Sequence, residues 1–190
     1  MRIGVYCGSF NPVHKGHIRI VRSVLRQKLV DRVLIVATGN YWHKQGLLPT
    51  EDRVRMLKHF ENEKIRIDET HNDIPYTVDL FKALKEEYPE DTLCLIIGGD
   101  NLPAFDQWVR YEELLTYDFV IVPRSPVTPS KVSAYMRKFG KENYTVLKTR
   151  NIPISSTFIR ENLEDYGKIK DMIDYRVYLD YKEILERETK

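Results

Sequence analysis

Short runs of β-branched and other apolar residues alternate with amphipathic stretches along this chain, and no other feature constrains its fold as strongly. The strand-like runs cover residues 3–7, 33–37, 64–68, 92–97, 119–122 and 145–147. The helix-like stretches cover residues 16–29, 50–60, 78–88, 131–138, 155–163 and 175–187. Strands separated by helices favour parallel pairing, with helices packed on both faces of the sheet. The alternation therefore predicts an α/β fold: a doubly wound parallel sheet of five to six strands with a C-terminal helical segment.

Length and composition suit a single domain that spans residues 1–190. The 30 basic and 28 acidic residues leave a net charge of +2, which provides no broad basic surface for nucleic acid. Cys7 and Cys94 lie in predicted strands without the spacing of a disulfide framework, as is typical of reduced thiols. Apolar runs of about six residues are too short to cross a membrane, and no leader pattern precedes the first strand. We therefore expect a cytoplasmic protein without membrane or nucleic-acid partners.

The loop after the first predicted strand, residues 8–17 with the sequence GSFNPVHKGH, is the strongest candidate for a ligand site. Parallel sheets bind ligands at the carboxyl ends of their strands. Gly8 allows close approach of the backbone, and the helix that follows directs free N–H groups at a ligand, so phosphate is the expected guest. His14 and His17 lie at this positive helix end, which favours their neutral form, and each ring can donate a hydrogen bond to phosphate oxygens. The alternatives are a glycine turn with two exposed histidines and a zinc site, which lacks a third ligand.

Two further loops carry polar groups suited to a nucleotide. Ser155, Ser156 and Thr157 begin a predicted helix, and Arg160 follows on the same face, an arrangement that suits phosphates. An ordinary helix cap with a solvent-facing arginine is the alternative. Residues 98–100, Gly-Gly-Asp, end a buried strand, where a nucleoside could lie against the backbone while the carboxylate accepts ribose hydroxyl protons. Here the alternative is a strand exit with Asp100 as a helix cap.

These motifs resemble the two signatures of the HxGH nucleotidyltransferases. The first signature matches residues 8–12 with His14, Gly16 and His17, and the second matches residues 154–160, ISSTFIR. Within that superfamily the chain resembles the nicotinate- or nicotinamide-nucleotide adenylyltransferases. The internal matches are His43-Lys44, Arg53, Met56, residues 76–79, residues 98–100, Trp108 and Arg124. The resemblance extends in the expected order from residue 2 to about residue 163.

The resemblance implies a Rossmann-like fold and the transfer of AMP from ATP to nicotinate mononucleotide, which yields deamido-NAD and pyrophosphate in NAD biosynthesis. It implies a catalytic role for His14, His17, Lys44 and Arg160. The implied ATP-binding residues are Gly8, Ser9, Phe10, His17, Gly98, Asp100, Arg124, Ser156, Thr157 and Arg160. The implied acceptor-binding residues are His43, Lys44, Arg53, Tyr76, Thr77 and Trp108. Mg²⁺ is expected to arrive on the ATP phosphates rather than on protein side chains.

The expected chemistry needs no general base, because the attacking phosphate is already ionised, and depends on positioning and charge stabilisation. The alternatives are the same transfer to nicotinamide mononucleotide or to another phosphorylated acceptor, such as a pantetheine phosphate, and an ATP-binding regulatory module without turnover. The sequence leaves both a monomer and a homo-oligomer open. The chain departs from the family pattern at Cys7, Tyr41-Trp42, Leu80 and Asp174. These departures leave the ATP-binding residues intact and fall mainly on the acceptor half.

Overall fold

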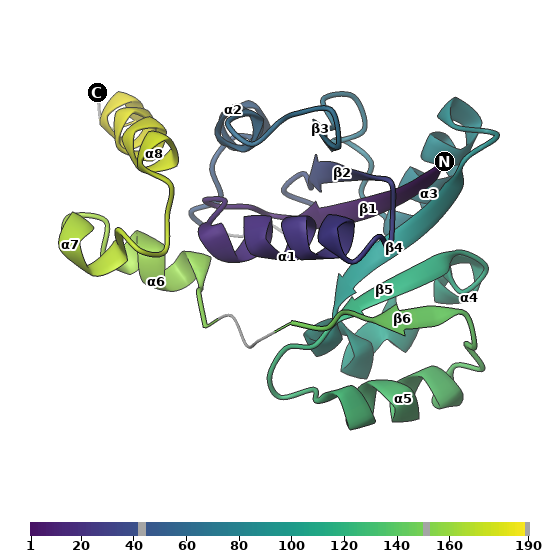
Figure 1. The fold of residues 1–190 in the computed structure, drawn as a ribbon. Coiled ribbons are helices and arrows are strands. Elements are labelled where there is room, and N and C mark those ends of the chain that lie inside the picture. Colours follow the sequence, from purple (N-terminus) through teal and green to yellow (C-terminus); the bar gives the residue numbers. More distant parts are fainter. Residues whose placement is uncertain (42–44, 150–152, 189–190) are drawn as a thin grey trace.

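A six-stranded, all-parallel sheet forms the centre of the computed structural model, which describes residues 1–41, 45–149 and 153–188. The strands are β1 (Arg2–Gly8), β2 (Arg32–Ala37), β3 (Ile65–Ile67), β4 (Thr92–Gly98), β5 (Asp118–Val122) and β6 (Tyr144–Val146). Their order across the sheet is β3-β2-β1-β4-β5-β6 (Figure 1). The predicted α/β class, the parallel sheet and the C-terminal helices are therefore confirmed.

Eight α-helices and one 3₁₀-helix are described. They are α1 (Lys15–Arg26), α2 (Thr50–Lys58), α3 (Thr77–Glu87), η1 (Gly99–Gln107), α4 (Tyr111–Leu114), α5 (Pro129–Lys138), α6 (Ser156–Glu161), α7 (Tyr166–Ile169) and α8 (Tyr175–Glu188). The sequence pattern did not predict α4 or α7, because a helix of about one turn shows too little periodicity. A helix after residues 98–100 was expected only as an alternative, and η1 lies there. None of the described helices is long and apolar enough to cross a membrane.

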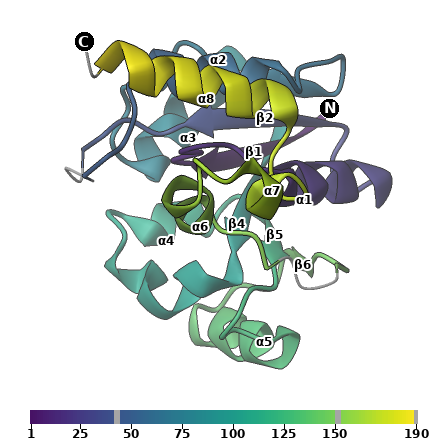
Figure 2. The ribbon, with the colours of Figure 1, turned by 90° about the vertical axis from the view of Figure 1, so that its left-hand side faces the viewer.

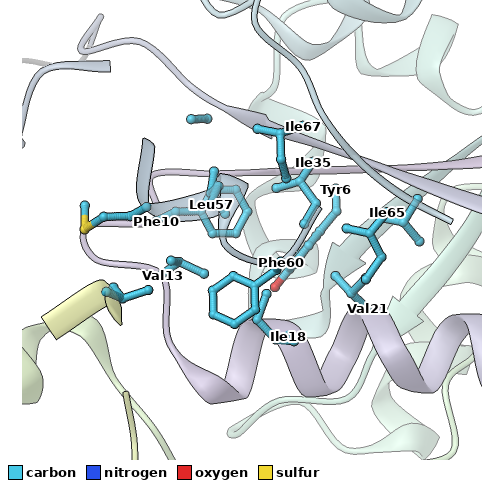
Figure 3. Packing of buried hydrophobic residues seen from close by; sticks show 14 of the residues in the cluster. Tyr6, Phe10, Val13, Ile18, Val21, Ile35, Leu57, Phe60, Ile65 and Ile67 are labelled. Atoms are coloured by element: carbon cyan, nitrogen blue, oxygen red, sulfur yellow. The ribbon is translucent and has the colours of Figure 1, made fainter. Parts of the chain in front are cut away.

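Side chains alternate between the two faces of the sheet and feed two separate apolar cores. On β1, Tyr6 belongs to the core beneath α1, α2 and the C-terminal helices, whereas Ile3 and Val5 belong to the core beneath α3, η1, α4 and α5. Figure 3 shows part of the first core, where Ile18 and Val21 of α1 lie near Phe60 and Ile65. Burial of both faces explains why the central strands are almost continuously apolar.

The C-terminal helices pack on the first core. Ile159 of α6, Ile173 and Val177 are fully buried in the same cluster as the apolar face of α1. Helix α8 lies alongside α2, far from the N-terminus (Figures 1 and 2). Asp180 of α8 accepts hydrogen bonds from Arg55 of α2 (Nη2–Oδ1, 2.9 Å) and from His59, the C-cap residue of α2 (Nε2–Oδ2, 2.7 Å).

The strand order reverses between β1 and β4. The connection from β1 leads through α1 toward β2 on one side, and the connection from β4 leads through η1 and α4 toward β5 on the other. The loops after these two adjacent strands therefore diverge and leave a crevice at their carboxyl ends. The predicted ligand loops, residues 8–17 and 98–100, lie at this point.

Candidate functional site

A cavity of about 500 Å³, here called the first chamber, opens at the crevice between the β1 and β4 loops. Its walls come from the β1 loop, the start of α1, the ends of β4 and β5, and the start of α6. The predicted ATP-binding side chains gather in this chamber. They are Ser9, Phe10, His14, His17, Asp100, Arg124, Ser156, Thr157 and Arg160, together with Gly8 and Gly98.

His14 and His17 cap the start of α1 with their ring nitrogens. Nδ1 of His14 accepts from the backbone N–H groups of Gly16 (3.1 Å) and His17 (3.3 Å). Nδ1 of His17 accepts from the backbone N–H of His14 (3.2 Å), which completes a reciprocal capping box. A neutral ring whose Nδ1 accepts carries its proton on Nε2. Each ring therefore keeps one N–H donor available to a ligand.

Both histidine rings are held in the neutral form. Burial, reinforced by the positive charge of Arg124, lowers the pKa of His14 to about 4. Burial and the neighbouring His14 ring lower the pKa of His17 well below its usual value. The two rings stack with centroids 3.6 Å apart, so protonation of both would place like charges in contact. The pair is thus a set of two parallel neutral donors rather than a cationic clamp.

The Phe10 ring packs against the histidine pair. The Phe10 backbone has a φ of 46°, an uncommon left-handed conformation for a residue with a side chain. The ring is buried, lies edge-on to His17 at 5.0 Å, and packs against Gly8, where a Cβ would meet it at 3.1 Å. Gly8 is therefore needed for Phe10 to fold under the loop, and the Phe10 ring acts as a support of the site.

The start of α6 contributes Ser156, Thr157 and Arg160 to the wall of the first chamber. Ser155 caps the helix by accepting from the N–H of Phe158 (3.3 Å), which leaves Ser156 to donate to the carbonyl of Pro12 (3.0 Å). Arg160 donates from Nη1 to the carbonyl of Asn11 (2.7 Å) and from Nη2 to the hydroxyl of Thr157 (3.2 Å). These bonds join two signatures that lie more than 140 residues apart in the chain.

Asp100 and Arg124 face each other at the ends of β4 and β5, with Nη1 and Oδ2 3.6 Å apart. Gly98 makes room for this carboxylate, because a Cβ at Gly98 would collide with Oδ1 of Asp100. Asp100 is the second residue of η1, but Gly98 occupies the N-cap position and no side chain caps this helix, so the alternative of Asp100 as a helix cap is not observed. The carboxylate is available to accept from hydroxyl groups, and Arg124 places a positive charge beside it.

A cavity of about 360 Å³, here called the second chamber, adjoins the first. Tyr76, Thr77 and Trp108, three of the predicted acceptor-binding residues, line it together with Tyr41 and Val109. Among the described residues, none that lines this chamber carries a charge. The residues that line both chambers are Cys7, Gly8, Ser9, Thr77, Asn101 and Trp108. Two ligands could therefore meet across a common boundary.

The structure corrects the expected role of Arg53 as a binder of the acceptor phosphate. Arg53 has no exposed surface, and its guanidinium donates only to groups of the chain itself. A phosphate cannot reach it in this arrangement. Arg110, which follows Val109 of the second chamber, forms an ion pair with Asp79.

His43 and Lys44, predicted to bind the acceptor, lie outside the described residues, so their assignment remains a prediction. Sequence reasoning overlooked Asn11, Asn101 and Gln107. Asn11 is buried and ties the β1 loop to the segment before α2 through Gly46 and Leu48. The polar neighbours of Asp100 and Trp108 were the available signal for Asn101 and Gln107, which line the chambers.

Side chains of the described residues offer no group of three histidine, cysteine or acidic ligands for a metal ion. Asp100 is the single carboxylate that lines the first chamber among the described residues, and it faces Arg124. A divalent cation in this chamber would therefore take most of its oxygen ligands from a bound anion and from water.

The cytidylyltransferase-like family model matches residues 5–162, which is more than half of the chain. A probable nicotinate-nucleotide adenylyltransferase of Cytophaga hutchinsonii is 31% identical over 185 residues, covering 93% of this chain and 93% of that protein. The protein of the same description from Christiangramia forsetii is 29% identical, again with 93% of both chains covered.

Solved structures show the same fold. The nicotinic acid mononucleotide adenylyltransferase of Plasmodium falciparum, solved in complex with NaAD, superposes with a TM-score of 0.76. It is 25% identical to this chain, and the match covers 95% of this chain and 93% of that one. These comparisons confirm the resemblance to the nucleotidyltransferases that was inferred from the sequence.

Proposed function

Because the chain belongs to the cytidylyltransferase-like family, we propose that this nucleotidyltransferase moves the AMP part of ATP onto nicotinate mononucleotide, with deamido-NAD and pyrophosphate as products. The relatives from Cytophaga hutchinsonii and Christiangramia forsetii and the Plasmodium falciparum enzyme support this choice of acceptor. One observation carries the proposal: two chambers share a boundary, and a pair of neutral histidine donors lies in the wall of the larger one.

ATP occupies the first chamber in this proposal. Its phosphates receive hydrogen bonds from Nε2 of His14 and His17, from the start of α6, and from Arg160. Asp100 accepts from the ribose hydroxyls, and Arg124 lies beside it. Neutral N–H donors suit the triphosphate, because they stabilise the negative charge that develops on its oxygens without transferring a proton to them.

The acceptor mononucleotide occupies the second chamber, where Trp108 stacks on its pyridine ring and Tyr76 and Thr77 surround the ring substituent. Its phosphate then lies at the boundary with the first chamber and attacks the α-phosphorus of ATP in line. The α-phosphorus gains a bond to this phosphate oxygen and loses its bond to the oxygen of the leaving pyrophosphate. Lys44 is proposed to contact the phosphates, and His43 to contact the acceptor.

Mg²⁺, bound to the triphosphate, would neutralise part of its charge. The chain's own contribution is to bind, orient and donate hydrogen bonds. A cytoplasmic location belongs to the proposal and is tested by cell fractionation, and light scattering measures whether the chain forms a homo-oligomer.

The test is pyrophosphate release with ATP, Mg²⁺ and a panel of acceptors: nicotinate mononucleotide, nicotinamide mononucleotide and pantetheine phosphate. We expect kcat/KM for nicotinate mononucleotide to exceed that for the amide by about tenfold or more. No acidic side chain among the described residues lines the second chamber to repel the carboxylate, and Asp79 is paired with Arg110. Equal rates for the two mononucleotides would contradict the assigned acceptor, and no release with any acceptor would contradict the transfer itself.

A variant of Trp108 tests whether the acceptor binds in the second chamber. Trp108→Ala should raise KM for both mononucleotides without reversing the preference, because stacking does not distinguish an acid from an amide. A reversed preference would show that Trp108 contacts the ring substituent rather than the ring face.

A further inference from the structure

Arg53, the second-turn arginine of α2, makes an unusual set of contacts for a fully buried side chain. Its Nη1 donates to two backbone carbonyls, those of Ser9 and Thr38, each at 2.8 Å. Nε donates to the carbonyl of Leu48 (2.9 Å), and Nη2 donates to the hydroxyl of Thr50 (2.9 Å). One rigid group therefore holds four oxygens from three separate segments.

The two carbonyls bound by Nη1 belong to the two loops that form the site. Ser9 lies in the β1 loop and lines both chambers, and Thr38 lies in the loop after β2 and lines the second chamber. Strands β1 and β2 are neighbours, with Gly8 opposite Ala37, so the guanidinium joins their loops just beyond the sheet. The backbone N–H of Thr38 also donates to the carbonyl of Gly8 (2.9 Å). The guanidinium of Arg53 then binds the carbonyl of the following residue, Ser9.

Packing alone does not explain the choice of arginine. No acidic side chain among the described residues lies within ion-pair distance of Arg53. Burial lowers its pKa, against the opposing effect of the Glu51 charge, although a guanidinium stays charged. An apolar side chain would fill the volume without burying a charge, but it would leave the loop carbonyls without donors. What the arginine supplies is a fixed spacing between the acceptor oxygens, because its five N–H groups lie in one plane.

We propose that Arg53 is a positioning residue, which sets the separation of the β1 and β2 loops and thereby the alignment of the acceptor phosphate with the α-phosphorus of ATP. The proposal rests on the proposed function. In-line transfer is sensitive to this alignment, and a misplacement of about 1 Å can cost a factor of about 100 in rate. Arg53 touches neither substrate in this scheme, so its loss acts on kcat more than on the binding of either substrate.

The central variant is Arg53→Lys, which keeps the charge but replaces the planar fork by one nitrogen with three hydrogens that cannot serve four oxygens. Its matched control is Arg55→Lys, the same substitution two residues along α2, at an exposed position that contacts Asp180 and Glu183 of α8. We expect Arg53→Lys to lower kcat by about 10- to 100-fold. The Kd of nicotinate mononucleotide alone and of a non-hydrolysable ATP analogue alone should change less than about threefold. Arg55→Lys should leave kcat unchanged.

Two kinetic results would overturn the proposal. A normal kcat in Arg53→Lys would mean that the spacing is irrelevant to the transfer. A tenfold weaker Kd for the mononucleotide with kcat retained would mean that Arg53 binds the acceptor phosphate directly. A neutral variant, Arg53→Gln, separates charge from spacing: loss of kcat in Gln but not in Lys would assign the effect to charge and also reject positioning.

Amide hydrogen exchange provides a readout that does not depend on turnover. Peptides covering residues 8–11 and 38–41 should exchange about tenfold faster in Arg53→Lys than in wild type or Arg55→Lys. If wild-type protein makes no dinucleotide, the proposed function fails, but the exchange result still decides whether Arg53 holds the two loops. Unchanged exchange in both peptides would overturn the proposal whatever the kinetics show.

Discussion

In the proposed function, the two histidines at the start of α1 serve both the fold and the bound nucleotide. Each Nδ1 satisfies backbone N–H groups that the first helical turn would otherwise leave without partners, and this leaves Nε2–H for a phosphate. Because Nδ1 caps the helix and Nε2 donates to the ligand, a substitution can remove one role and keep the other. Asparagine reproduces the position of Nδ1, whereas glutamine reproduces that of Nε2.

We predict that His17→Asn lowers kcat by about 10²-fold or more, because removal of one transition-state hydrogen bond costs about 3 to 4 kcal/mol. The asparagine oxygen can still accept from the N–H of His14, so the thermal midpoint should stay close to that of wild type. Steady-state kinetics and thermal denaturation measure the two effects. His17→Gln, which can keep the donor but not the cap, should retain more of kcat, and a near-normal kcat in His17→Asn would remove His17 from the proposed machinery.

The depressed pKa of His14 predicts a loss of stability in acid. Its folded-state pKa is about 4, below the unfolded value of 6.5, so the unfolded chain binds more protons between these pH values. Stability from this group is full above pH 6.5 and falls as the pH drops toward 4, by about 2 kcal/mol between pH 7 and pH 5. Urea unfolding at both pH values measures it.

His14→Asn supplies the comparison, because asparagine is a good N-cap and does not titrate. The free energy of unfolding of this variant should fall by about 2 kcal/mol less than that of wild type over the same pH interval. An equal fall in both proteins would place the acid-sensitive group elsewhere.

At the scale of elements, local rules placed most helices and strands but misjudged some of their ends. Helix α1 was expected to reach residue 29 and ends at Arg26, because Lys28 adopts a φ of 54° and the N–H of Leu29 returns to the carbonyl of Val24. Glycine is the usual residue at such a left-handed helix end, so a lysine there gave no signal. The final helix was expected at residues 175–187 and is observed at Tyr175–Glu188, because a long amphipathic repeat leaves little freedom.

Asp180 of α8 is a buried carboxylate that contacts α2, in addition to the ion pair between Arg187 of α8 and Asp52 of α2, and it yields a prediction about stability alone. Asp180→Ala should lower the free energy of unfolding by about 2 kcal/mol, because Arg55 and His59 both lose a charged hydrogen-bond partner. Neither α8 nor its partners line the two chambers, so kcat should remain within about twofold of wild type. Urea unfolding and pyrophosphate release provide the two measurements.

Glu183→Ala is the matched control, because Glu183 contacts the same Arg55 from an exposed position. Exposed ion pairs contribute little, so this variant should unfold close to wild type. If the two variants lost equal stability, the buried contact would not be what holds α8 in place.

At the scale of the whole molecule, the C-terminal helices complete the first core rather than form a unit of their own. Ile159, Ile173, Val177 and Ile184 are buried in the cluster that contains the apolar face of α1. We therefore propose that residues 1–190 form one domain and predict that it unfolds in a single transition. Tryptophan fluorescence and far-ultraviolet circular dichroism should give the same urea midpoint. Two separate midpoints would indicate that the C-terminal helices unfold independently.

The sequence by itself determined the class of fold and the loops that carry polar groups. Periodicity is a local property, and the carboxyl ends of parallel strands are known once the strands are known. The sequence alone therefore predicts that residues 8–17, 98–100 and 155–160 lie at one edge of the sheet. The resemblance to a family added the roles of single residues, which spacing alone leaves open.

Only the tertiary structure decided which charges remain available to a ligand. From the sequence, Arg53 and Arg110 are two cations near predicted loops, and nothing local distinguishes a phosphate ligand from a loop clamp or an ion pair. Arg53 is buried because carbonyls 44 and 15 residues away converge on it, and Arg110 is occupied by Asp79, 31 residues away. A side chain takes the partner that the folded backbone brings within about 3 Å, and that distance depends on the packing of the entire chain.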